Sequence, residues 1–213
     1  MDLDRYTFEK QLWSEGYQRV MGLDEVGRGC LCGPVVAAGV ILNPEMEENL
    51  SLKDSKTIKK SGREALSTRI KNEALYWTIQ SCSPAEIDEL NILHASLKAM
   101  MKCAESDAAA PGYLLIDGNK SPGTMLPHTC LVKGDNRSAS IAAASILAKV
   151  YRDELMVKLH ETYPVYGWDR NVGYPTKEHF AGLEKHGYTD HHRMSFKLRT
   201  EKKFGSTGKF VGK

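Results

Sequence analysis

The sequence predicts an α/β fold in which helices cover a central sheet, and three stretches carry that prediction. Residues 35–42 (VVAAGVIL) form a continuous apolar run after Gly-Pro, which is typical of a strand buried on both faces. Residues 113–117 (YLLID) are a short apolar strand that ends in an aspartate. The run ASIAAASILAKV after Ser138 is apolar nearly all round a helix, so this helix should be buried in the core.

The first half of the chain alternates helices and strands. Phe8 and Leu12 lie four residues apart in a segment that stops at Gly16, which predicts a short amphipathic helix over 6–15. The next expected elements are strands over 19–25, 35–42 and 76–82, a polar loop at 53–56, and a helix capped by Ser61 with Leu66 and Ile70 on one face. The first two strands flank a Gly-Arg-Gly turn and place it at one edge of the sheet.

The second half begins with a strong helix signal. Residues 83–86 (SPAE) have the capping-box pattern with proline at the first helical position. The remaining expected elements are a helix over 92–105, strands over 113–117 and 129–133, the long helix after Ser138, a loop rich in Gly, Tyr and Trp at 166–175, and a helix capped by Thr176 and closed by Gly187.

Composition indicates an ordinary globular chain. Its 213 residues suffice for one domain with a sizeable core, and 41% hydrophobic with 26% charged residues is typical of such domains. No apolar run approaches membrane-spanning length, and the first residues (MDLDR) are too acidic for a signal peptide, so we expect a cytoplasmic protein. Five cysteines without paired spacing argue against a disulfide framework or a zinc site, and we expect reduced, mostly buried thiols.

The net charge of +2 hides an uneven distribution. Residues 176–213 carry nine Lys or Arg and four acids, while the first 175 residues are net acidic. An acidic body with a basic end suits a metal site beside a polyanion-binding surface, although a solvated basic tail would give the same pattern.

Residues 22–29 (GLDEVGRG) place two adjacent carboxylates, Asp24 and Glu25, directly before a basic turn. The carboxylates repel a phosphate, whereas the turn Gly27-Arg28-Gly29 attracts it through backbone N–H groups and a guanidinium. A hard divalent cation such as Mg²⁺ reconciles the two, because it binds carboxylate and phosphate oxygens together. Taken alone, the pair is more typical of a charged surface turn after a strand.

Two further acids complete a constellation with Asp24 and Glu25. Asp117 ends a buried strand, where open α/β sheets place ligands, and Asp135 precedes the buried helix, where an acid could also serve the helix dipole alone. Successive strand residues face opposite ways, so Asp24 and Glu25 can share a site only if the chain bends nearby. Two divalent ions would neutralise four converging carboxylates and would catalyse displacement at phosphorus, which predicts phosphodiester hydrolysis.

Two familiar nucleotide-binding motifs fail on spacing. The dinucleotide fingerprint needs a glycine at position 32, where Cys32 stands, and a Walker loop ending at Lys209 needs one at position 203, where Lys203 stands. A nucleotide-cofactor enzyme is therefore a disfavoured alternative.

Several motifs in order resemble the bacterial ribonuclease HII family. They are GLDEVGRG, GPVVAAGVIL, DSK at 54–56, LLIDG at 114–118, KGDNRSASIAAASILAKVYRD at 133–153 and GYPTKEH at 173–179, within residues 20–196. The resemblance implies a ribonuclease H-like mixed five-stranded sheet flanked by helices, with a small helical C-terminal extension. It implies a metal-dependent endonuclease that cuts the RNA strand of RNA–DNA hybrids and incises 5′ of single ribonucleotides in duplex DNA. The products would carry 5′-phosphate and 3′-hydroxyl ends, as in ribonucleotide excision repair and RNA primer removal.

The resemblance also implies roles for individual residues. The family's catalytic, metal-binding acids fall on Asp24, Glu25, Asp117 and Asp135, which would hold two Mg²⁺ or Mn²⁺ ions with substrate. Its 2′-hydroxyl reader falls on Gly27, Arg28 and Gly29, and its junction-sensing tyrosine falls on Tyr174. Lys56, Lys133 and Arg193 could position phosphates. The histidines 179, 191 and 192 are expected at the surface, because the acids already supply hard-metal ligands.

This chain departs from the family at Cys30 and Cys32, where proline and alanine are usual. The two replacements are expected to alter the rigidity of the turn. Only 23 residues precede Asp24, which favours type HII over type HIII with its long N-terminal domain.

We expect a catalytic domain over 1–187, which includes the Tyr174 loop and the following helix, and a basic tail over 188–213. The tail lacks an obvious sliding-clamp peptide, so nucleic acid is the expected partner of a monomer. The main alternative is a non-catalytic hybrid-binding module of the same fold.

Overall fold

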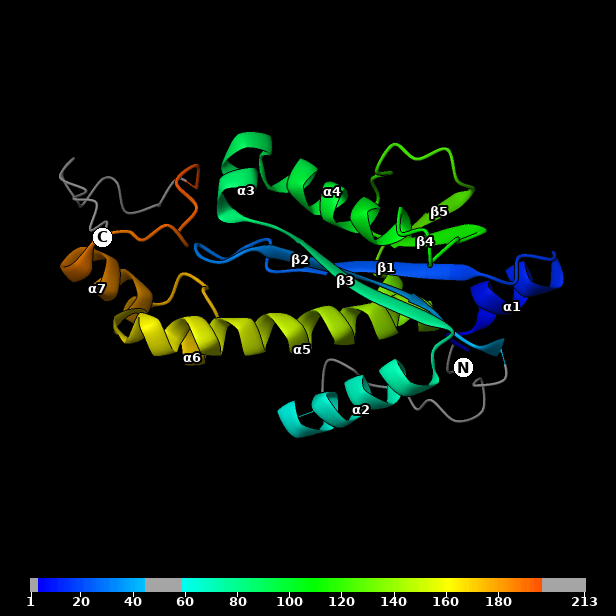
Figure 1. Cartoon of the computed structure of the whole chain (residues 1–213), viewed down its shortest axis with the longest axis horizontal. Coiled ribbons are helices and arrows are strands. Elements are labelled where there is room, and N and C mark those ends of the chain that lie inside the picture. Colours follow the sequence, from blue (N-terminus) through cyan, green and yellow to red (C-terminus); the bar gives the residue numbers. More distant parts are fainter. Residues whose placement is uncertain (1–3, 45–58, 197–213) are drawn as a thin grey trace.

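A computed structural model describes residues 4–44 and 59–196, in which five strands form one mixed sheet (Figure 1). The strand order is β3-β2-β1-β4-β5. β1 pairs antiparallel with β2 and parallel with β4, while β3 and β5 form the two edges. The expected mixed five-stranded sheet is therefore confirmed. Within the described ranges, no helix is long and apolar enough to cross a membrane.

The elements follow the chain in the order that the sequence predicts. The strands are β1 (Val20–Val26), β2 (Val35–Ile41), β3 (Tyr76–Cys82), β4 (Tyr113–Asp117) and β5 (His128–Leu131). The helices are α1 (Thr7–Ser14), α2 (Lys60–Glu73), α3 (Pro84–Leu90), α4 (Ile92–Ala104), α5 (Ala139–Thr162), α6 (Trp168–Asn171) and α7 (Lys177–His186). Two short 3₁₀ turns, η2 (Gly134–Asn136) and η3 (Pro164–Tyr166), flank α5. The loop expected at 53–56 lies outside the described residues.

Helix starts were predicted well where a side chain caps the backbone. The Ser83 capping box is complete, and Ser138 and Thr176 each accept a backbone N–H of the helix that follows them. The predicted cap at Ser61 is wrong, because α2 already begins at Lys60 and Lys59 occupies the cap position without a side-chain hydrogen bond.

The last predicted strand ends earlier than expected. β5 stops at Leu131 instead of continuing to Lys133, whose backbone is left-handed with φ 55°. A left-handed residue cannot continue a strand. The chain therefore turns here into η2 and then into α5.

Helices cover both faces of the sheet (Figure 1). α5 lies across β1 and β2 with α2 beside it, while α4 packs on the other face with α3 next to it. Gly22 lets α5 approach the centre of β1, because a Cβ there would lie 2.2 Å from the carbonyl carbon of Ser140. This contact sets the height of α5 above the strand that carries Asp24 and Glu25.

The C-terminal elements gather at the end of the sheet where β1 connects to β2 (Figure 1). Residues 188–196 belong to this assembly. His192 forms a β-bridge with Cys32, and the N–H of Arg193 donates to Leu31. The domain boundary expected after residue 187 therefore does not coincide with a structural break, and the rest of the expected tail, 197–213, lies outside the described residues.

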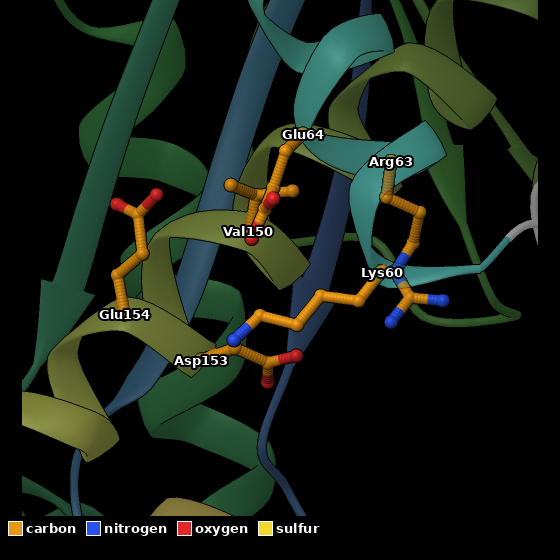
Figure 2. Close-up of a pocket in the computed structure, with 6 residues that line it drawn as sticks. All are labelled: Lys60, Arg63, Glu64, Val150, Asp153 and Glu154. Carbon is orange, nitrogen blue, oxygen red and sulfur yellow. The ribbon is translucent and has the colours of Figure 1, made fainter.

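A small pocket lies between α2 and α5 (Figure 2). Its lining residues are Lys60, Arg63, Glu64, Val150, Asp153 and Glu154. Asp153 is already ion-paired with Lys149 at 2.8 Å. None of the residues predicted for the active site lines this pocket, so it is separate from the site described below.

Replacing Gly22 by alanine should lower the free energy of unfolding by about 3 kcal/mol, as expected for a side chain forced against a rigid backbone. The measurement is a urea unfolding curve. Gly112→Ala is the matched control, because a Cβ at Gly112 would meet nothing closer than 3.7 Å. Equal effects of the two substitutions would show that the contact between α5 and β1 is not tight.

Candidate active site

Parallel pairing brings two of the predicted acids to one edge of the sheet. Leu23 of β1 pairs with Ile116 of β4, so the next residues along the two strands are Asp24 and Asp117. Glu25 follows on β1, opposite Ala37 of β2. The carboxyl ends of the two central parallel strands thus carry three carboxylates.

Asp135 reaches the same edge through a backbone hydrogen bond. The N–H of Gly134 donates to Asp117 Oδ1 over 2.6 Å, which ties η2 to the end of β4. A side chain at position 134 would crowd Asp117 Oδ1 at 3.2 Å and Ile141 at 2.6 Å. Asp135, the next residue, is buried and lies close enough to Asp117 for the two charges to repel.

The adjacent acids on β1 share the site without a bend between them. β1 runs straight through Val26, and the chain turns only at Gly27, where φ is 90°. The Asp24 side chain instead folds back, so that its Oδ1 accepts the N–H of Glu25 over 2.7 Å. Glu25 forms an ion pair with the exposed Arg28 at 3.1 Å.

Burial and mutual repulsion raise the pKa of three acids. The pKa of Asp24 lies well above its usual value because of burial and the charges of Glu25 and Asp117, while a hydrogen bond from the Ser145 hydroxyl opposes the shift. Burial also raises the pKa of Glu25 against the effect of Arg28. Burial raises the pKa of Asp117 too, and the N–H of Gly134 opposes it. A cation placed among these groups would favour their ionised forms.

The donor set suits a hard divalent ion, although the protein does not enclose one by itself. Over residues 4–44 and 59–196, no three His, Cys, Asp or Glu side chains are already grouped to hold a metal. All four acids offer carboxylate oxygens, the ligands that Mg²⁺ and Mn²⁺ take. Mg²⁺ commonly binds one or two carboxylates and completes its shell with water and substrate phosphate.

Two buried arginines hold the turn beside the acids. Arg152 of α5 donates to the carbonyl oxygens of Pro34, Val172 and Cys32 at 2.8–3.1 Å. Its Nε would lie 2.2 Å from a Cβ at Gly27, so this position requires glycine for space as well as for its positive φ.

Arg152 was not predicted from the sequence. The available signal was its place in a row with Ala148 and Met156, all spaced by four residues and all buried on α5.

The second arginine corrects a prediction. Arg193 is only 2% exposed, and it donates to the carbonyl oxygens of Gly33 and Arg28 at 3.0 Å. A guanidinium that is buried and engaged in this way does not contact substrate phosphate. The predicted phosphate-binding role of Arg193 is therefore wrong, and its role is to brace the turn.

Tyr174 lies beside the turn Gly27-Arg28-Gly29. Its ring Cε1 is 3.7 Å from the Cβ position of Gly29, and its hydroxyl donates to the Cys30 thiol. The ring is 41% exposed. The N–H of Leu31 donates to Gly173 over 2.8 Å, which joins the Tyr174 loop to the turn.

The roles of the two predicted lysines stay predictions. Lys133 is exposed and lies two residues before Asp135. Lys56 lies outside the described residues, and its role stays a prediction.

All five cysteines are free, and Cys130 is the least buried of them.

The histidines correct another expectation. His179 and His192 are 0% and 3% exposed, not at the surface, and their Nε2 atoms lie 3.1 Å apart. His191 is half-buried against the rings of Tyr163 and Trp168. The sequence signal for burial was weak, because histidine is intermediate in its preference for the core.

Comparison with known proteins gives one consistent result. A family model described as Ribonuclease HII matches residues 21–199. Ribonuclease HII of Salinibacter ruber is 50% identical over 196 residues, covering 90% of this chain and 98% of that protein.

Solved structures show the same similarity. The ribonuclease H2 of Pyrococcus horikoshii superposes with a TM-score of 0.74 at 24% identity, covering 83% of this chain and 93% of that one. Archaeoglobus fulgidus RNase HII, solved in a complex with PCNA, has a TM-score of 0.67 at 26% identity, with coverage of 85% and 96%.

The buried histidines predict a dependence of stability on pH. Burial, with the nearby His179 and His191, lowers the pKa of His192 to about 3, against about 6.5 in the unfolded chain. Because the unfolded chain then binds more protons, the free energy of unfolding should fall as the pH drops from about 6.5 toward 3.

The test is urea unfolding from pH 8 to pH 4. His192→Phe should flatten the acid-side slope by up to about 1.4 kcal/mol per pH unit, the limit for one group. Trp77→Phe, which removes no titratable group, should keep the wild-type slope. An unchanged slope in His192→Phe would mean that His192 is readily protonated in the folded protein.

Proposed function

This chain belongs to the ribonuclease HII family, and on that premise we propose that Asp24, Glu25, Asp117 and Asp135 are its metal-binding catalytic acids. The protein is a ribonuclease H, an endonuclease that hydrolyses the RNA strand of RNA–DNA hybrids. It incises 5′ of single ribonucleotides in duplex DNA and leaves 5′-phosphate and 3′-hydroxyl ends, as the family does.

One observation carries the assignment of the acids. Three carboxylates with raised pKa values lie near the carboxyl ends of two parallel strands, and η2 adds the buried Asp135 beside Asp117. Keeping buried carboxylates together is unfavourable unless a cation joins them. Such a site is therefore built to bind cations and, through them, a polyanion.

The family uses divalent metal ions, and we propose two Mg²⁺ or Mn²⁺ ions in the substrate complex. When bound, such ions polarise the phosphodiester and make water a better nucleophile. The chain's own contribution is to hold the ligands: the N–H of Gly134 orients Asp117, and the hydroxyl of Ser145 orients Asp24. Arg28 orients Glu25 through their ion pair.

The turn and Tyr174 supply substrate recognition in this proposal. In the turn Gly27-Arg28-Gly29 the glycines carry no side chain, so the backbone can approach a ribose 2′-hydroxyl, the group that distinguishes RNA from DNA. The Tyr174 ring lies next to Gly29 and can stack on the nucleotide at the RNA–DNA junction. Lys133, which is exposed two residues before Asp135, contacts a phosphate in this proposal.

The proposed partner is nucleic acid alone, bound by a monomer. The A. fulgidus relative was solved with PCNA, and we propose no clamp contact for this chain. We also propose a cytoplasmic location, which agrees with the five free cysteines.

The main test is incubation with a DNA duplex that contains one ribonucleotide, with Mg²⁺ or Mn²⁺ and with a chelator. Wild-type protein should nick 5′ of the ribonucleotide only when metal is present. Asp117→Asn should lower kcat by more than about 100-fold, because even indirect partners of metal ligands cost 10–100-fold. The asparagine oxygen can still accept from Gly134, so the fold should persist.

Asp107→Asn is the control for this substitution, because it changes an exposed acid in the connection between α4 and β4. Near-normal turnover of Asp117→Asn would remove Asp117 from the site. Absence of cleavage by the wild type in either metal would instead favour a non-catalytic hybrid-binding module of the same fold.

Tyr174→Ala should selectively weaken cleavage at a single ribonucleotide. The loss of one stacked ring should reduce kcat/KM for that substrate about tenfold relative to a long hybrid, while the metal concentration for half-maximal activity stays the same. Tyr151→Ala is the matched control, because Tyr151 is 43% exposed on α5. An unaltered preference between the two substrates would refute junction reading by Tyr174.

A further inference from the structure

Tyr174 is tied through its backbone to two buried histidines that the proposed chemistry does not use. We infer that His179 and His192 form a neutral hydrogen-bond relay that positions Tyr174 and thereby sets the preference for the RNA–DNA junction. This inference rests on the proposed function of Tyr174. His179 and His192 are positioning residues, because they act through the Tyr174 loop.

The position of the ring proton on His179 follows from its contact with Trp168, whose indole N–H can only donate. The indole N–H of Trp168 lies 3.1 Å from His179 Nε2, so this nitrogen accepts and carries no proton. The single proton of the neutral ring is then on Nδ1, which lies 3.0 Å from the carbonyl oxygen of Tyr174. His179 therefore donates to the backbone of Tyr174.

His192 has the opposite tautomer for the same kind of reason. The backbone N–H of Thr189 donates to His192 Nδ1 over 2.9 Å, so Nδ1 carries no proton. The ring proton is on Nε2, which faces His179 Nε2 at 3.1 Å. The donors thus run in one direction, from Thr189 through His192 and His179 to Tyr174, and the single lone pair of His179 Nε2 is shared between the N–H groups of Trp168 and His192.

The relay is satisfied only when both rings are neutral. A second proton on His192 would face the N–H of Thr189, and a second proton on His179 would face the indole N–H of Trp168. Burial lowers the pKa of both histidines, and the neighbouring His179 and His191 contribute at His192. Tyr166 packs edge-on against His179 and His192 with ring centroids 6.0 and 5.0 Å away, which excludes water from the pair.

The relay closes a ring of contacts around the turn. The C-terminal segment that carries Thr189 and His192 bonds to the turn, because Gly33 donates to His191 and Arg193 donates to Leu31. Leu31 in turn donates to Gly173, the neighbour of Tyr174. The hydrogen bonds from His192 to His179 and from His179 to Tyr174 complete this ring of contacts. The distance between Tyr174 and Gly29 therefore depends on the relay.

A purely space-filling role would make a different prediction. Rings that only fill the core need a shape but no particular proton positions, and phenylalanine would serve them well. A relay needs a donor at the Nε2 position of residue 192, and ring shape alone does not supply it.

The tautomers are tested on the intact protein labelled with ¹⁵N at histidine. Two-bond ¹H–¹⁵N spectra at pH 7 should show His179 protonated on Nδ1 and His192 protonated on Nε2, with the signals assigned from His179→Gln and His192→Phe. An imidazolium, or either tautomer reversed, would overturn the relay whatever the activity of the enzyme.

The functional test compares three variants on a single-ribonucleotide duplex and on a long hybrid. His192→Phe should raise KM for the single-ribonucleotide duplex about fivefold, the effect of one neutral hydrogen bond, and leave kcat and the long hybrid within about twofold. His192→Gln, which restores an amide donor near Nε2, should recover most of the loss even if it is less stable. His191→Phe is the matched control, because its ring packs on Trp168 outside the relay.

The outcomes separate this inference from the function on which it rests. If His192→Phe and His191→Phe behave alike, or if glutamine is worse than phenylalanine in junction preference, the relay does not position Tyr174. If the wild type cleaves both substrates without preference, the proposed role of Tyr174 fails and the inference fails with it. If no substrate is cleaved while the tautomers are as stated, the proposed catalytic function fails instead.

Discussion

The close approach of α5 to β1 at Gly22 is the constraint on which the site depends. A Cβ at this point would lie 2.2 Å from the backbone of α5, so the helix sits directly on the strand that carries Asp24. Side chains of α5 then reach the site from fixed positions along the helix. The hydroxyl of Ser145 donates a hydrogen bond to Asp24, and the Arg152 side chain occupies the space beside Gly27. One packing contact therefore orients both the acids and the turn that accompanies them.

The acids are placed where their charges oppose folding. Burial raises the pKa of Asp24, Glu25 and Asp117, and each feels the charge of a neighbour. The fold tolerates this arrangement because backbone N–H groups and Ser145 donate to the carboxylates, and because Arg28 pairs with Glu25. Cation binding and structural stability are consequently linked at this edge of the sheet.

The recognition surface is organised by polar groups that never reach the substrate. Arg152 and Arg193 satisfy their buried guanidinium groups largely on backbone carbonyl oxygens of the turn and its neighbours. In the same interior His179 bonds to the backbone of Tyr174, and His192 bonds to His179. Buried polar networks of this kind favour one arrangement strongly, because any alternative leaves unpaired groups away from water.

The sequence by itself determined the strands and the helices capped by Ser83, Ser138 and Thr176, and it predicted the four acids, because hydrophobic periodicity, capping residues and local motifs act over a few neighbouring positions. It did not determine which polar residues become buried. Arg193 was expected at a phosphate and His179 and His192 at the surface, yet all three lie inside. Arg193 bonds to Arg28, far away in the chain, whereas the two histidines bond to each other and to the Tyr174 backbone. Burial of a polar side chain depends on partners that only tertiary packing brings together, and for that physical reason the tertiary structure alone decided how the turn and Tyr174 are held.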